Sequence, residues 1–185
     1  MTKTFKQFIV EEKLPTIYCD MDGVLADFER GANQTLIGFG YPDWFSNHWK
    51  EYPQEKADEL RWEIIKKKKF FWRDLPPMGD ALALWRFIQK YNPHILSHAI
   101  KYMPTAKPEK TQWLKRVVGL NNPSVTHLVD NRGDKRKYAT YNGHPNILID
   151  DYGKNCAEWK DAGGIAIHHT SAVKTISELK SLGFK

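Results

Sequence analysis

The sequence predicts an α/β fold in which a doubly wound parallel sheet carries a small inserted helical cap. Short runs of β-branched and aliphatic residues alternate with longer amphipathic segments along most of the chain, and this alternation is typical of strand–helix–strand units with parallel strands. Residues 28–77 depart from the pattern, because they are dense in aromatic and charged residues and contain no strand-like run. We therefore expect residues 1–27 and 78–185 to form the α/β core and residues 28–77 to form the cap.

Composition narrows the class of protein. The 185 residues are enough for one α/β domain with a modest insert. No apolar run approaches the roughly 20 residues that span a bilayer, and the first residues lack the apolar stretch of a signal peptide. Cys19 and Cys156 are too few for a disulfide scaffold. These features predict a cytoplasmic protein without a membrane partner, and they leave the oligomeric state open, a homodimer included.

The first predicted strand, residues 16–19, follows Pro15 and leads into Asp20-Met21-Asp22-Gly23. Two carboxylates two residues apart point the same way if the chain stays extended, and a glycine allows a sharp turn out of the sheet. Paired like charges at a strand end are costly unless a cation holds them. The pattern therefore indicates a site for a hard divalent ion such as Mg²⁺, which prefers oxygen ligands. Turn-capping acids or a Ca²⁺ loop are the alternative interpretation.

Helices are expected next, over residues 25–36 and 55–68. The second of these would place Leu60, Ile64 and Ile65 on one side. It ends in a run of four lysines, residues 66–69, which suits a solvated helix end near the negative end of the helix dipole better than a phosphate site.

The core resumes with a helix over residues 81–91, capped by Asp80 and burying Leu82, Trp85, Phe87 and Ile88. A strand over residues 93–97 ends at Ser97, and a helix over residues 105–118 ends at Gly119.

Three further strands are predicted over residues 124–129, 146–150 and 165–167. Helices are expected over residues 155–162 and 172–182, the last with Val173, Ile176, Leu179 and Leu182 on its apolar face.

Chemically active residues recur where the predicted strands end. Asp20 and Asp22 follow the first strand, Ser97 ends the second, Asp150 ends the fourth, and Asp151 comes directly after it. In parallel sheets ligands bind beyond the carboxyl ends of the strands, so these side chains should converge. Two acids, a metal ligand, a hydroxyl and a nearby cation are the equipment of phosphoryl transfer, in which positioning and charge neutralisation do most of the catalysis.

The nine residues from Asp20 to Phe28 (DMDGVLADF) resemble the first motif of the haloacid dehalogenase-like phosphohydrolases, in the form found in 5′(3′)-deoxyribonucleotidases. The stretch from Phe70 to Met78 resembles the return from the cap in those enzymes, and Ser97 and Asp150-Asp151 match their second and fourth motifs. The resemblance implies that Asp20 is a nucleophile that takes the phosphoryl group. Asp22 would be the acid and later the base, with Mg²⁺ held by Asp20, the Asp22 backbone carbonyl and Asp150.

The same resemblance implies roles for several other residues. Ser97, His98 and Lys135 would contact the phosphate, and Asp151 would order the metal shell. Lys137 stays open as the alternative third-motif lysine, because Gly133 is an extra residue in this segment. The guanidinium of Arg132 could add a bidentate contact to the phosphate. Lys110 resembles a family lysine near the phosphate, although a surface lysine is the favoured interpretation.

A deoxynucleoside monophosphate is the expected substrate. In the resembled enzymes aromatic residues stack on the nucleobase, and Phe28, Trp44, Phe45 and Phe71 are the candidates here; packing inside the cap would explain the same residues. A phosphatase acting on nucleic-acid ends ranks second, since the net charge of +6 and residues 66–69 favour anions. Another small phosphate ester, or a non-catalytic phosphate-binding protein, remains an alternative.

Overall fold

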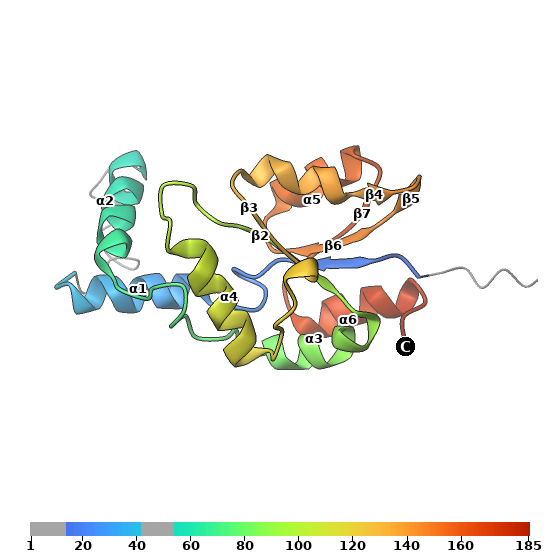
Figure 1. Cartoon of the computed structure of the whole chain (residues 1–185), viewed down its shortest axis with the longest axis horizontal. Coiled ribbons are helices and arrows are strands. Elements are labelled where there is room, and N and C mark those ends of the chain that lie inside the picture. Colours follow the sequence, from blue (N-terminus) through green and yellow to red (C-terminus); the bar gives the residue numbers. More distant parts are fainter. Residues whose placement is uncertain (1–13, 42–53) are drawn as a thin grey trace, which may run out of the picture.

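The computed structural model describes residues 14–41 and 54–185. In this part of the chain a parallel sheet runs in the order β3-β2-β1-β6-β7 (Figure 1). Its strands are β1 (Ile17–Cys19), β2 (His94–His98), β3 (Thr126–Val129), β6 (Ile147–Asp150) and β7 (Ile165–His168). The chain leaves β1 toward one edge and returns to its other side at β6, so β1 is central. The predicted doubly wound α/β fold is confirmed. Sheets of this kind bind ligands where the order of the strands reverses, which here is between β1 and β6.

Helices cover both faces of the sheet. α5 (Gly153–Asp161) and the 3₁₀ helix η4 (Arg132–Tyr138) lie on one face, and α3 (Ala81–Ile88) and α6 (Ala172–Ser181) lie on the other (Figure 1). Neighbouring residues of β1 alternate between two apolar clusters: Ile17 and Cys19 pack in the larger one, and Tyr18 packs in the smaller one against Trp159 of α5. The strands are thus buried on both faces, as parallel strands require.

Two helices of the predicted cap, α1 (Phe28–Gly38) and α2 (Gln54–Lys67), stand to one side of the sheet (Figure 1). α1 begins later than residue 25 because the chain turns first: the N–H groups of Leu25 and Ala26 both donate to the Met21 carbonyl. Asp27 then caps the helix by accepting from the Arg30 N–H at 3.0 Å. Both helices fall within the proposed 28–77 insert, while Trp44 and Phe45 lie outside the described residues.

In the view of Figure 1, α4 (Ala106–Val117) lies between the cap helices and the rest of the core. None of the helices in the two described ranges is long and apolar enough to cross a membrane.

Several local predictions were wrong, each for a packing reason. α3 ends at Ile88 and continues as a 3₁₀ turn, η2 (Gln89–Tyr91). Leu82 is 42 % exposed, and Leu84 occupies the buried face instead. Asp80 does not cap α3; its carboxylate accepts the N–H of Ala172 at 2.5 Å, at the start of α6. Val173 is 79 % exposed, because Ala172, Thr175 and Leu179 form the inward stripe of α6.

A short hairpin, β4 (Thr140–Tyr141) and β5 (His144–Pro145), was not predicted. Its turn is Asn142-Gly143, and both residues have positive φ, 49° and 79°. An Asn-Gly pair is the usual signature of such a two-residue turn, so the signal was present in the sequence. A 3₁₀ turn, η3 (Pro123–Val125), also shortens the predicted start of β3.

Candidate active site

The candidate site lies at the carboxyl end of β1. The Asp20 N–H donates to the Ile149 carbonyl at 2.8 Å, which holds the first acid of the motif beside the end of β6. Gly23 follows with φ +75°, and its N–H closes the turn onto the Ala26 carbonyl at 2.8 Å. A Cβ atom on Gly23 would lie 2.0 Å from Asp151 Oδ2, so the absence of a side chain there lets Asp151 approach the first motif.

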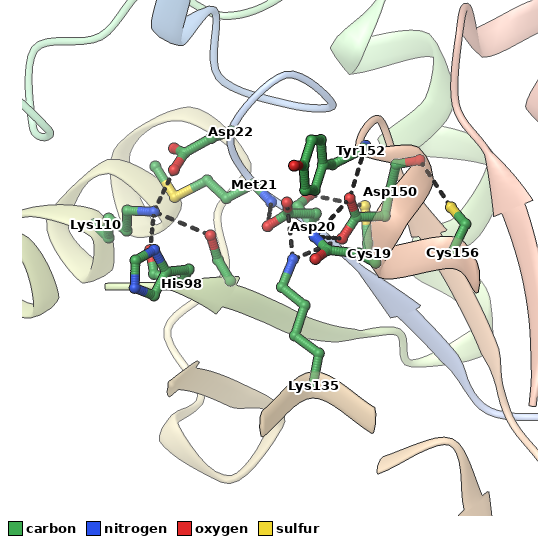
Figure 2. A network of polar contacts seen from close by, with 12 residues as sticks. Cys19, Asp20, Met21, Asp22, His98, Lys110, Lys135, Asp150, Tyr152 and Cys156 are labelled. Atoms are coloured by element: carbon green, nitrogen blue, oxygen red, sulfur yellow. Dashed lines mark hydrogen bonds and ion pairs between the residues drawn. The ribbon is translucent and has the colours of Figure 1, made fainter. Parts of the chain in front are cut away.

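Lys135 joins the acids of two strands. Its Nζ atom donates to Asp150 Oδ2 at 2.6 Å and lies 2.9 Å from Asp20 Oδ2, as Figure 2 shows. All three side chains are buried. Lys137 instead pairs with Asp134 at 2.6 Å and is exposed. Between the two lysines that the sequence left open, Lys135 is the one that contacts the carboxylates.

Asp150 is enclosed by hydrogen-bond donors. Besides Lys135, it accepts from the Tyr152 N–H at 2.9 Å and from Asn155 Nδ2 at 2.9 and 3.0 Å. The part of Asn155 in the site was not predicted, although its place in the first turn of α5, four residues after Asp151, was a usable signal. These donors fix the carboxylate that the sequence proposes as a metal ligand.

Asp20, Asp150 and Asp151 bring one carboxylate oxygen each within 4.8 Å of one another. Hard divalent ions take such oxygen donors, so the residues present fit Mg²⁺. Asp151 joins the two predicted carboxylates of Asp20 and Asp150, whereas the Asp22 side chain contacts Lys110 (Figure 2). The predicted use of the Asp22 backbone carbonyl stays a prediction.

The position of Lys110 differs most from the prediction. The sequence favoured a surface lysine, but its side chain is wholly buried. Its Nζ donates to Asp22 Oδ2 at 2.5 Å, to Ser97 Oγ at 3.0 Å and to the His98 carbonyl at 2.7 Å (Figure 2). The early turns of α4 face the end of β2, which carries the lysine into the site. A buried ammonium is tolerated there because these three acceptors replace its water.

The two acids of the first motif have opposite pKa shifts. Burial alone would raise the pKa of Asp20, but the ammonium groups of Lys135 and Lys110 outweigh it and hold that pKa below its ordinary value. Burial raises the pKa of Asp22; Lys110 opposes this increase, and the Asp20 carboxylate adds to it. Asp20 is therefore suited to remain ionised, and Asp22 to carry a proton.

Asp151 is shifted as well. Although the residue is exposed as a whole, desolvation of its carboxylate and the negative charges of Asp20 and Asp150 raise its pKa to about 7. Burial would lower the pKa of Lys135, but the carboxylates of Asp20 and Asp150 raise it by more. Its pKa therefore lies above the ordinary value, and the amine stays charged.

A pocket of about 600 Å³ opens onto these acids. Its core side includes the predicted residues His98 and Arg132. His98 Nε2 lies 3.2 Å from the Asp130 carbonyl oxygen, and burial lowers its pKa. The Arg132 guanidinium lies over the Tyr152 ring, 5.4 Å from its centre.

The cap side of the pocket is aromatic. Phe28 lines it as predicted, together with Arg61, Trp62 and Trp72, whose part in the site was not predicted. Phe71 is not among the residues that line this pocket; it is buried and packs edge-on against Phe28 at 5.7 Å and Trp72 at 5.1 Å. Crowded aromatics marked this region in the sequence, but not which of them faces the cavity.

Comparison with known proteins supports the fold. No family model matches the chain, and no curated protein sequence matches it. Solved structures do. L-2-haloacid dehalogenase from Xanthobacter autotrophicus, with chloropropionic acid covalently bound, superposes with a TM-score of 0.54 at 15 % identity, over 93 % of this chain and 84 % of that chain.

Two further structures are a hydrolase from Streptococcus pneumoniae and a HAD family hydrolase from Deinococcus radiodurans with bound phosphate and sodium. The first has a TM-score of 0.51 at 14 % identity, over 91 % of this chain and 99 % of that chain. The second has a TM-score of 0.50 at 13 % identity, over 92 % and 89 %. At such identities the likeness establishes the haloacid dehalogenase type of fold.

Proposed function

We propose that this protein is a Mg²⁺-dependent phosphomonoesterase that removes phosphate from deoxynucleoside monophosphates through an aspartyl-phosphate on Asp20. The observation that carries the proposal is the difference between the two acids of one turn. Asp20 is paired with Lys135 and its pKa is lowered, whereas Asp22 is paired with Lys110 and its pKa is raised. Neighbouring carboxyl groups with opposite shifts are how a site assigns an ionised nucleophile and a protonated acid.

Asp22 is suited to proton transfer at the leaving oxygen. One of its oxygens receives a hydrogen bond from Lys110; the other, Oδ1, is buried and has no hydrogen-bond partner within residues 14–41 and 54–185. A carboxyl oxygen that is held but not saturated can give its proton to the departing alcohol and then accept one from the attacking water. General acid catalysis of this kind contributes about 10²–10⁴-fold.

Phosphate oxygens would be held by Ser97 and Lys135. The Ser97 oxygen already accepts from Lys110 at 3.0 Å, so its own hydroxyl proton remains available as a donor. Lys135 stays charged beside Asp20 and can neutralise the charge that builds up between nucleophile and phosphate. His98 and Arg132 line the same pocket and would add donors from the core side.

Asp20, Asp150 and Asp151, with the Asp22 backbone carbonyl, would hold the Mg²⁺. When bound, the ion would neutralise the phosphate oxygens and the acid cluster. The Deinococcus radiodurans hydrolase of similar fold has bound phosphate and sodium, which supports an anion and a cation as ligands of a protein with this fold.

A deoxynucleotide suits the pocket in size and wall chemistry. Its volume of about 600 Å³ lies in the range of small-molecule sites, and Phe28, Trp62 and Trp72 give the cap side aromatic surface. Base stacking on such side chains contributes about 1–3 kcal/mol per base.

Mg²⁺-dependent turnover across a panel of phosphate esters tests the proposal. We expect hydrolysis of dUMP or dTMP that disappears on chelation and returns with Mg²⁺. The Asp20→Asn variant should fold and show no turnover, and Asp22→Asn should lose about 10²–10⁴-fold in rate. An active Asp20→Asn protein would refute the nucleophile, and a panel without any turnover would leave only phosphate binding on this fold.

Phosphatase activity on nucleic-acid ends remains the second candidate. The four exposed lysines of residues 66–69 favour it, but Asp27, Glu29 and Asp58 line the pocket and would repel a polyanion. Oligonucleotides with terminal phosphates distinguish the two. Strong salt-dependent binding and dephosphorylation would favour nucleic acid; activity confined to free deoxynucleotides would remove it.

A further inference from the structure

His168 extends the pairing of β6 and β7 by one residue. Asp150, the last residue of β6, is opposite His168 in the register of the sheet, and its carbonyl accepts the His169 N–H at 2.9 Å. Asp151 lies beyond the end of the strand. Its carbonyl oxygen is 2.8 Å from Nε2 of His168, and because a carbonyl only accepts, the imidazole carries a hydrogen on Nε2 and donates. A side chain of β7 thus holds a residue that the strand pairing no longer reaches.

Asp151 needs such a restraint, because no cation of the chain holds its carboxylate. Asp20, Asp150 and Asp151 bring one carboxylate oxygen each within 4.8 Å of one another, and like charges at that distance repel. Lys135 pairs with Asp20 and Asp150, but Asp151 has no ion pair within residues 14–41 and 54–185. Without a metal ion, repulsion therefore favours movement of Asp151 away from the other two acids.

The place that Asp151 occupies is narrow. On the side of the first motif, a Cβ atom on Gly23 would lie 2.0 Å from Asp151 Oδ2, so the carboxylate packs directly against that turn. On the side of β7, the His168 imidazole holds the backbone of the same residue. His168 is exposed and is not among the residues that line the pocket. Its connection to the site is therefore the hydrogen bond to Asp151.

We propose that His168 is a positioning residue of the metal site. Its hydrogen bond holds the Asp151 backbone where the carboxylate meets those of Asp20 and Asp150, so that the three can share a Mg²⁺ ion. The inference rests on the Mg²⁺ site of the proposed function and adds a residue of β7, a strand that carries none of the predicted site residues. Nε2 can donate from the neutral and from the charged imidazole, so the role does not require His168 to titrate.

Titration calorimetry of the substrate-free protein with Mg²⁺ tests this. The titration is run at about pH 8, above the range in which exposed histidines normally change charge, so that loss of a charge does not contribute. We expect His168→Ala to weaken Mg²⁺ binding by about threefold to tenfold, which is what one hydrogen bond contributes. His168→Leu, which keeps more of the side-chain bulk but has no donor, should give the same loss.

His168→Gln should restore most of the affinity, because its amide N–H can donate to the same carbonyl. His144→Ala is the matched control: His144 is another exposed histidine, on β5, and does not line the pocket. Its variant should bind Mg²⁺ as the wild type does.

A double-mutant cycle with Asp151→Ala separates positioning from a general effect on structure. Once the Asp151 carboxylate is gone, removing the imidazole should cost no further Mg²⁺ affinity. Equal losses in the two backgrounds, or an unchanged affinity of His168→Ala, would overturn the inference. Absence of Mg²⁺ binding by the wild type would contradict the proposed metal site and the inference with it. Mg²⁺ binding without turnover of any phosphate ester would contradict the phosphatase function alone.

Discussion

Gly23 and Asp151 approach so closely that position 23 has no room for a side chain. A Cβ atom there would lie 2.0 Å from Asp151 Oδ2, and the φ of Gly23 is +75°. The glycine is therefore required twice, once by its own left-handed backbone and once by an acid that follows the fourth predicted strand. The contact joins the first and the last acidic motifs of the chain in one site.

Replacing Gly23 by Ala should displace Asp151 as well as strain the turn. We expect a loss of stability of about 1–2 kcal/mol from the left-handed backbone and a further loss of Mg²⁺ affinity, because Asp151 must leave the acid cluster. Chemical denaturation and calorimetric Mg²⁺ titration measure the two effects. Gly119→Ala is the matched control, because Gly119 has φ +72° and open space around it. It should lose stability alone; equal Mg²⁺ affinities in the two variants would contradict the argument.

Lys135 should hold the site together when no metal is bound. Removing its charge with Lys135→Met leaves the buried carboxylates of Asp20 and Asp150 without their shared cation, and breaking a buried ion pair costs about 3–5 kcal/mol. Mg²⁺ should restore part of that loss, since it would neutralise the same acids. Thermal unfolding with and without Mg²⁺ measures both effects. Lys137→Met, on the surface, should change stability by less than about 0.5 kcal/mol.

Mg²⁺ affinity should fall below neutral pH because of Asp151. Desolvation and the charges of Asp20 and Asp150 raise its pKa to about 7, so a proton occupies this carboxylate as the pH drops and must be displaced by the ion. Between pH 8 and pH 6 the affinity should decrease about tenfold. Titration calorimetry at several pH values measures this. The Asp151→Asn variant should bind more weakly and lose that part of the pH dependence; an unaltered pH dependence would assign it to another group.

The sequence could predict those site residues that lie at the ends of strands. Asp20, Ser97 and Asp150 each follow or end an apolar run, and parallel strands bring such positions to one edge. Lys135 was preferred over Lys137 for another reason, the resemblance of its segment to the third motif of the phosphohydrolases. What local pattern does not contain is the direction of a helix relative to the sheet, and Lys110 was misjudged for that reason.

Periodicity also failed where two helices pack together. Leu82 and Val173 satisfy an apolar stripe on their own helices, yet both are exposed. α3 and α6 contact each other, and their buried faces carry other residues, Ala81 among them on α3 and Ala172 on α6. Asp80, a plausible cap for α3, is used by α6 instead. In the cap, many aromatics are close in sequence, so composition alone could not separate Trp72 and Trp62, which line the pocket, from Phe71, which packs behind them.

Lys110 should determine how readily Asp22 gives up its proton. Its ammonium group opposes the burial that raises the pKa of Asp22, and it contacts the carboxylate at 2.5 Å. In Lys110→Met that pKa should rise further. Asp22 then stays protonated to higher pH but becomes a weaker acid, so the alkaline limb of kcat/KM should move upward while the rate at neutral pH falls by about tenfold or more.

The pH profile separates this effect from a general loss of structure, which would lower the rate without moving the limb. Lys107→Met is the control on the same helix, since Lys107 is exposed and pairs with Asp130 at 2.7 Å; its profile should match the wild type. The variant should also accumulate less phosphorylated Asp20 in rapid-quench experiments, because the step that needs the acid slows while the step that needs the base does not. A larger phosphoenzyme burst in Lys110→Met would mean that Asp22 does not act as the acid.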